Sequence, residues 1–336
     1  MGSSGNQVVV HLGALPDYTY RNLELAVTHL PNFDTILVVD KRLHRTPTNV
    51  TVVQLDDLVT QQQVDAIRIA LKQQGIDPNW RKGYWAQVFL RFLVLKELTR
   101  QLDQSLPMIQ IESDVISFLT PELIEPLKVS VGDLCGMPFI DAETAGPGLM
   151  FAKHPAAMGN VCQFVLDRLE SRLEVSDMKS LARAVQEGLV SELPSMPGEF
   201  GPRINVQVGQ QSDNALVLFD AAAVGQYLFG IDPRNNNGIR VPGYRERRGD
   251  IDPGVWRNWA ILQCADGIER ISCEVEDKRV VFGNLHIHSK QLLGPVSSMD
   301  PVWLETVRIA NGLQGVRPEI DIRYLTKTWL RRLLPK

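Results

Sequence analysis

The sequence has no long apolar run, no strong charge of either sign and little cysteine. None of its apolar segments approaches the roughly 20 residues needed to span a bilayer. Residues 1–5, Met-Gly-Ser-Ser-Gly, are small and polar, which argues against a signal peptide. The formal net charge of −4 gives no general attraction to nucleic acid or to anionic membranes. We therefore expect a cytoplasmic protein with no nucleic-acid partner and no transmembrane segment.

The cysteines show no metal-binding or disulfide pattern. There are four, at positions 135, 162, 264 and 273, without a Cys-x-x-Cys pair. This spacing argues against a zinc site and against a disulfide framework. Reduced, mostly buried thiols are the expected state, as in other cytosolic proteins.

The size and composition allow one large globular domain. The chain has 336 residues, of which 44% are hydrophobic and 22% charged, so a sizeable core is available. We find no internal repeat and no low-complexity linker. The sequence predicts a single domain over residues 6–336, with a first half (6–130), a loop-rich second half (131–295) and a C-terminal helical tail (296–336).

Strand and helix patterns alternate in the first half. We expect apolar strands at residues 8–12, 35–39, 50–55 and 108–111, and helices at residues 20–30, 61–74 and 84–102. Continuous apolar strands separated by helices indicate a mostly parallel sheet covered on both faces. The predicted fold class is therefore α/β, a Rossmann-like mixed sheet flanked by helices.

The second half is less regular. We expect strands at 134–140, 148–151, 215–219 and within 275–288, helices at 155–169 and 178–189, and loops at 192–203 and 232–253. Five arginines in the last loop suggest either a lid that supplies cations to phosphate or a solvated basic loop. Residues 326–336 mix basic and apolar side chains, which favours a packed terminal helix over weak peripheral membrane contact.

An acidic pair follows the strand at 108–111. In Ile111-Glu112-Ser113-Asp114 the two acids are separated by one residue, so on a strand they share one face. Ligands of open α/β sheets bind outside the carboxyl ends of the strands. Magnesium and manganese prefer such oxygen ligands. We predict that Asp114 and Glu112 bind a divalent metal; the alternative is a solvated pair of acids.

Two histidines and a lysine alternate near the end of the chain. His286, His288 and Lys290 would lie on one face of a regular strand. Neutral imidazole binds manganese, and an ammonium group neutralises phosphate. The same segment is similar to the opening motif of polymerase-and-histidinol-phosphatase-type hydrolases, but no histidine follows Lys290 to complete that site. We predict metal ligation by His286 or His288, beside a diphosphate-binding Lys290.

Four segments, taken in order, resemble a group of glycosyltransferase-like proteins of the GT-A fold. They are residues 83–92 (GYWAQVFLRF), 111–115 (IESDV), 219–235 (FDAAAVGQYLFGIDPRN) and 284–290 (NLHIHSK). The resemblance implies a metal held by an Asp-x-Asp-type motif and completed by a C-terminal histidine. The chain has glutamate at the first acidic position. Glu112 can therefore reach the ribose or a metal-bound water instead, and Asp114 is the better ligand.

The resemblance also places a nucleotide on the first half and the acceptor on the second. Leu12 and Gly13 would lie beside the base, and Asp40 would contact uracil or ribose. Arg91 would reach the phosphates, unless it is a surface group of its helix. Asp220 is either the N-cap of the following helix or a general base for the acceptor hydroxyl. Lys290 would stabilise the leaving diphosphate as a catalytic group.

Together these observations predict a metal-dependent glycosyltransferase. It would move a sugar from a nucleotide-diphosphate donor to a hydroxyl acceptor in glycan or polysaccharide assembly. The resemblance favours a UDP-sugar as the donor over a GDP-sugar. The cofactor would be Mn²⁺ or Mg²⁺. Two alternatives remain: a metal-dependent nucleotidyltransferase or phosphohydrolase, and a catalytically silent nucleotide-sugar-binding module.

Overall fold

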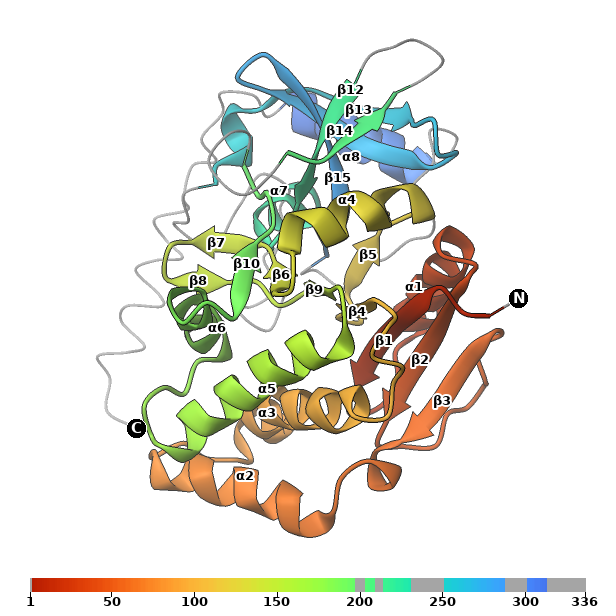
Figure 1. Ribbon diagram of the computed structural model, residues 1–336. Coiled ribbons are helices and arrows are strands. Elements are labelled where there is room, and N and C mark those ends of the chain that lie inside the picture. The colour runs from red at the N-terminus through yellow and green to blue at the C-terminus, as the bar shows by residue number, and fades with distance from the viewer. Residues whose placement is uncertain (1, 197–202, 209–213, 231–250, 288–300, 313–336) are drawn as a thin grey trace.

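The computed structural model describes residues 2–196, 203–208, 214–230, 251–287 and 301–312. Its central element is a seven-stranded sheet in the order β10-β6-β9-β4-β1-β2-β3 (Figure 1). The strands are β1 (Gly5–His11), β2 (Phe33–Val39), β3 (Val50–Gln54), β4 (Met108–Ile111), β6 (Cys135–Met137), β9 (Leu149–Ala152) and β10 (Val190–Glu192). Neighbouring strands are parallel except around β9, which is antiparallel to β4 and β6.

Helices and a second sheet cover the two faces of this sheet. On one face of the sheet, the strand side chains pack against α2 (Gln61–Gln73), α3 (Trp80–Thr99), α5 (Pro155–Glu170) and α6 (Asp177–Gln186). On the other face, they pack against α1 (Asp17–His29), α4 (Pro121–Val131) and the second sheet. The α/β prediction, with a mainly parallel sheet flanked by helices, is confirmed.

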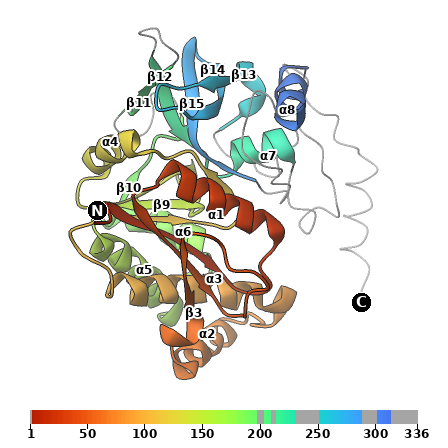
Figure 2. The same ribbon diagram turned by 90° about the vertical axis from the view of Figure 1, so that its right-hand side faces the viewer.

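The second sheet has six strands and lies above α1 and α4 in the views shown (Figure 2). Its order is β11-β12-β15-β14-β13, with β5 paired to β15. The strands are β5 (Val115–Ser117), β11 (Asn205–Gln207), β12 (Asn214–Phe219), β13 (Arg257–Gln263), β14 (Glu269–Val275) and β15 (Lys278–His286). α7 (Ala223–Phe229) and α8 (Pro301–Gly312) cover its outer face. A short hairpin joins β7 (Phe139–Asp141) to β8 (Thr144–Ala145), and 3-10 turns occupy Leu55–Asp57 and Pro253–Val255.

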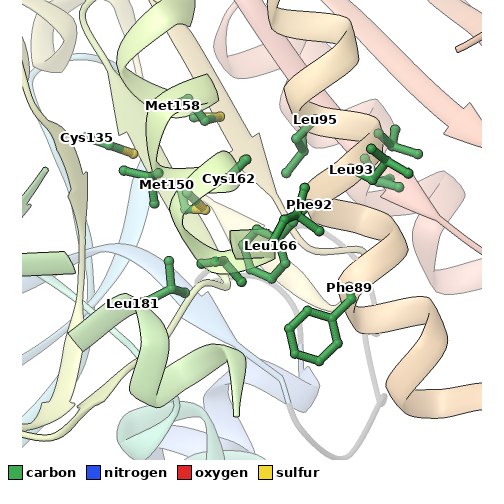
Figure 3. Close-up of a cluster of buried hydrophobic side chains, with 14 of the residues drawn as sticks. Phe89, Phe92, Leu93, Leu95, Cys135, Met150, Met158, Cys162, Leu166 and Leu181 are labelled. Atoms are coloured by element: carbon green, nitrogen blue, oxygen red, sulfur yellow. The ribbon is translucent and has the colours of Figure 1, made fainter. Parts of the chain in front are cut away.

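The largest core lies between the seven-stranded sheet and the pair α3 and α5. Phe89 and Phe92 of α3 face Met158, Cys162 and Leu166 of α5 (Figure 3). These side chains are at most 5% exposed. All four cysteines are free and buried, as the sequence predicts. None of the described helices is both long and apolar enough to cross a membrane.

Most predicted elements of the first half match the observed ones closely, but β5 and α4 at the end of that half were not predicted. The second half differs more. The strand expected at 134–140 is broken at Pro138 into β6 and β7, because proline cannot donate to a ladder. The short strands β8, β10 and β11 and the longer strand β13 were not predicted, and most of β14 precedes the range 275–288 in which the final strands were expected. The loop expected at 232–253 lies mostly outside the described residues, as does the tail at 326–336.

The strand order of the seven-stranded sheet reverses at β1: β2 and β3 are added on one side of it, and β4 on the other. Strand β1 pairs with both β2 and β4 in parallel. The order β3-β2-β1-β4 matches the first four positions of the Rossmann order 3-2-1-4-5-6, in which ligands bind in the crevice outside the carboxyl ends of the strands, where the order reverses. We therefore expect a ligand-binding site beside the residues that follow β1 and β4.

Candidate active site

Glu112, Asp114 and His286 meet at this point although they come from opposite halves of the chain. One ligand atom from each lies within 4.8 Å of the others. His286 Nε2 is 3.5 Å from Glu112 Oε2 and 3.5 Å from Asp114 Oδ2. All three side chains are at most 20% exposed. The structure thus brings the acidic pair and the first predicted histidine together.

The acids do not continue β4. The strand ends at Ile111, and residues 112–114 form a turn into β5. Asn22 of α1 holds this turn by donating to the carbonyls of Ser113 (2.9 Å) and Val115 (2.6 Å). The two carboxylates share one side because of the turn and not because of strand alternation.

His286 is the last residue of β15 and has a defined tautomer. Its Nδ1 lies 3.1 Å from the carbonyl oxygen of Ala221, which can only accept a hydrogen bond, so Nδ1 carries the proton. The lone pair of Nε2 then faces two carboxylates. Burial lowers the pKa of His286, although the charge of Asp220 opposes this. A neutral imidazole and two carboxylates around one point form a donor set that fits a divalent cation.

Two glycines make room for this histidine. A Cβ on Gly148 would lie 3.0 Å from His286 Nδ1, and a Cβ on Gly225 would lie 1.8 Å from the His286 carbonyl oxygen. The carbonyl of Gly148 also accepts from Glu112 N at 2.8 Å. Close approach of β9 and α7 to the end of β15 therefore requires residues without side chains.

The buried carboxylate of Asp220 accepts three hydrogen bonds from backbone N–H groups. Oδ1 accepts from Val224 N (3.0 Å), and Oδ2 accepts from Gly225 N (2.9 Å) and His286 N (3.0 Å). Burial raises the pKa of this carboxyl, while the three N–H groups act against the rise. The N-cap position of α7 is Ala222 and not Asp220, the residue that the sequence suggested, but the Asp220 carboxylate still binds two N–H groups of the first turn from two residues further back. These contacts favour a structural role, which also fixes His286, over the general base.

Arg91 is not a surface group. Its side chain is 12% exposed and forms ion pairs with Glu112 and with Asp177, the latter at 3.3 Å. Burial lowers the pKa of Arg91, partly offset by the charge of Asp177. The guanidinium therefore holds Glu112 beside the site, and phosphate contact by Arg91 stays a prediction.

The residues predicted to contact the nucleotide lie at the same edge. Asp40 follows β2 and accepts from Gly13 N at 2.6 Å through Oδ1. Gly13 has φ of 112°, a conformation that favours glycine. Leu12 packs partly on the core beside α3. His11, the last residue of β1, lies 3.1 Å from Ser113 Oγ through Nδ1.

Several expected site residues lie outside the described part of the chain. These are His288, Lys290 and the loop arginines 234, 240, 245, 247 and 248. Sequence reasoning missed other residues that hold the site: Asn22, His11, Gly148 and Asp177. The sequence did contain one indication of the place of Asp177. It directly follows Ser176, the N-cap of α6, and is therefore an acid in the first turn of that helix.

The sequence matches no protein-family model. No curated protein matches it either. Similar solved structures include mouse xyloside xylosyltransferase 1 without ligand, with 9% identity and a TM-score of 0.39 over 56% of this chain and 85% of that one. The galactosyltransferase LgtC, complexed with donor and acceptor sugar analogues, shows 9% identity and a TM-score of 0.34 over 56% and 73% of the two chains. Glycosyltransferase GlyE of Streptococcus pneumoniae shows 14% identity and a TM-score of 0.32 over 58% and 46%. No family follows from similarities at these TM-scores.

Proposed function

We propose that this protein is a metal-dependent glycosyltransferase that uses a nucleotide-diphosphate sugar. The observation that carries the proposal is the meeting of Glu112, Asp114 and His286 at the switch point of the seven-stranded sheet. This is where an α/β sheet binds a nucleotide, and the donor set is one that binds a cation of the kind that accompanies diphosphates.

Asp114 and His286 would be direct ligands of Mn²⁺ or Mg²⁺, and Glu112 a ligand or an acceptor for a metal-bound water. When bound, the metal would neutralise negative charge on the departing nucleoside diphosphate. The chain's own groups prepare that position. The carbonyl of Ala221 fixes the tautomer of His286, and Arg91 fixes the carboxylate of Glu112. Lys290 would add a positive charge to the same diphosphate.

The nucleoside would lie over the carboxyl ends of β1 and β2. Asp40 holds the backbone of Gly13 there and would present its second oxygen to a ribose or base. The resemblance of the sequence segments favours uridine over guanosine. The acceptor would be a hydroxyl group of a glycan or polysaccharide under assembly, and we propose a cytoplasmic location for this reaction.

A nucleotide-sugar panel tests the proposal directly. The full chain is incubated with UDP- and GDP-sugars and several oligosaccharide acceptors, with Mn²⁺ or with a chelator, and both released nucleotide and glycosylated product are measured. We expect product with one donor type, dependent on the metal. Turnover of free nucleoside triphosphate without sugar transfer would favour a nucleotidyltransferase or phosphohydrolase. Nucleotide binding without any turnover would favour a silent binding module.

A further inference from the structure

Three aromatic side chains form a cluster at the start of α3, in which Trp80 and Tyr84 are exposed and Trp85 is partly buried against the core. Trp80 and Trp85 have ring centroids 6.4 Å apart at an interplanar angle of 22°, and Tyr84 stands edge-on to both, at 6.0 and 5.3 Å. Trp80 is 43% exposed and Tyr84 is 44% exposed. Grouped aromatic rings at a surface are uncommon and mark binding sites more often than scattered ones do.

The backbone is strained where it builds this cluster. Arg81, Lys82 and Gly83 follow one another in the left-handed region, with φ of 48°, 61° and 88°. In an unbroken helix, positions 80 and 85 would point about 140° apart. The left-handed turn instead brings the Trp80 ring nearly parallel to that of Trp85. Unfavourable backbone conformations that persist in a folded protein are concentrated at functional sites.

The cluster lies next to the candidate active site. Tyr84 and Arg91 are seven positions apart on α3, which places them on the same helix face and about 10 Å apart along its axis. Arg91 in turn binds Glu112. The cluster therefore lies on the helix face that leads, through Arg91 and Glu112, to the metal position.

We propose that Trp80, Tyr84 and Trp85 bind the acceptor glycan by stacking on the apolar face of a pyranose ring. This inference rests on the proposed function, since it names the acceptor of that reaction. The faces of aromatic rings are electron-rich and attract the polarised C–H groups that line one side of a pyranose. The guanidinium of Arg81 covers one face of the Trp80 ring, with Cζ 4.6 Å from the ring centroid, which leaves the rest of the cluster for the sugar. Arg81 and exposed Lys82 carry N–H donors for the hydroxyls of a sugar bound there.

Calorimetry with neutral oligosaccharides tests the cluster separately from catalysis. The panel contains gluco-, galacto-, manno- and xylo-oligosaccharides, titrated into the full chain and into Trp80→Ala and Tyr84→Ala variants. We expect at least one oligosaccharide to bind and each variant to bind it about five- to tenfold more weakly. Leu173→Ala is the matched control, because Leu173 is 65% exposed and outside the cluster; its affinity should equal that of the wild type.

A second titration, with UDP and GDP in the presence of Mn²⁺, separates the two hypotheses. Unchanged nucleotide affinity in the variants, with weaker oligosaccharide binding, supports the inference. Nucleotide binding in the wild type without any effect of the variants on oligosaccharides overturns the inference and leaves the proposed function intact. Oligosaccharide binding that depends on the cluster, without nucleotide binding, overturns the proposed function alone. A change of molar mass in Trp80→Ala, measured by light scattering, would show that a second copy covers the cluster and would also overturn the inference.

Discussion

Asp220 binds the backbone of His286: its Oδ2 accepts from the His286 N–H at 3.0 Å. The same carboxylate binds two N–H groups in the first turn of α7. One buried side chain thus fixes both the helix and the metal-facing end of β15. This arrangement leads to the first prediction.

Asp220→Ala should destabilise the protein by roughly 3 kcal/mol or more, because three buried N–H groups lose their acceptor. Asp220→Asn should cost less, since one acceptor oxygen remains. Urea unfolding measures both, with Asp34→Asn as the control at an exposed acid. A fully stable Asp220→Asn variant that lacks transferase turnover would support the general-base alternative instead.

Asp114→Asn and His286→Ala should each weaken Mn²⁺ binding about 100-fold or more, since changes even outside the ligand shell cost about 10- to 100-fold. Electron paramagnetic resonance titration of free Mn²⁺ measures the affinity, and circular dichroism checks folding. Ser113→Ala, between the two acids, should keep most of the affinity. Wild-type affinity in Asp114→Asn would remove this residue from the site. Unfolding of His286→Ala would show that the imidazole serves the core.

Gly148→Ala should impair the metal site without unfolding the protein. The added methyl group would lie 3.0 Å from both His286 Nδ1 and Val115 Cγ2, so the imidazole must shift. We expect Mn²⁺ affinity to fall about tenfold, as for other disturbances of groups that orient ligands. Gly312→Ala meets no atom within 4 Å and provides the control. Equal affinity in both variants would show that His286 does not need its observed position.

Arg91→Met should destabilise the fold by about 3–5 kcal/mol, because Glu112 and Asp177 lose their buried counter-charge. Arg100→Met, at the C-cap of the same helix, should cost less than about 1 kcal/mol, because Arg100 is 63% exposed in its pair with Glu97. Urea unfolding compares the two. If Arg91→Met kept its stability and lost only nucleotide affinity, phosphate binding would be the principal role of Arg91.

The buried pair of Asp266 and Arg270 should make stability sensitive to acid. Burial acts to raise the pKa of Asp266, but its hydrogen bonds and charge contact with Arg270, at 2.5–2.7 Å, outweigh burial and lower it. The carboxylate therefore stabilises the fold above its unfolded pKa of about 3.9, and this stabilisation is lost as the pH falls through the lower folded pKa. Unfolding free energies at pH 7 and 3 should differ less in Asp266→Asn than in the wild type. An equal difference would contradict the assignment.

The first half of the fold was readable because its signals are local. Apolar strands and helical spacing predict β1 to β4, α1 and α2 to within a few residues, since β1, β2 and β4 are buried on both faces. β3 lies at the edge of the sheet and is only partly buried, but its valine and threonine residues favour a strand. The second sheet was not readable as a unit. β5 has three residues, Val115–Ser117, and becomes a strand only by pairing with β15.

The candidate site was predicted in part for the same reason. Residue chemistry indicated Glu112, Asp114 and His286, although the turn at 112–114 replaces the expected strand. Asp177 and Asn22 escaped notice because their roles depend on tertiary contacts with Arg91 and with the turn. Asp220 was readable as a cap, whereas its bond to His286 crosses between distant segments.

The turn at 112–114 has one further consequence. It is the first place along the chain where the backbone passes from the seven-stranded sheet, at β4, to the six-stranded sheet, at β5. His286 ends β15, the strand to which β5 pairs. A cation held by Glu112, Asp114 and His286 would therefore link the two sheets to each other. Binding of the nucleotide and the ion would strengthen this link between the sheets, and their release would weaken it.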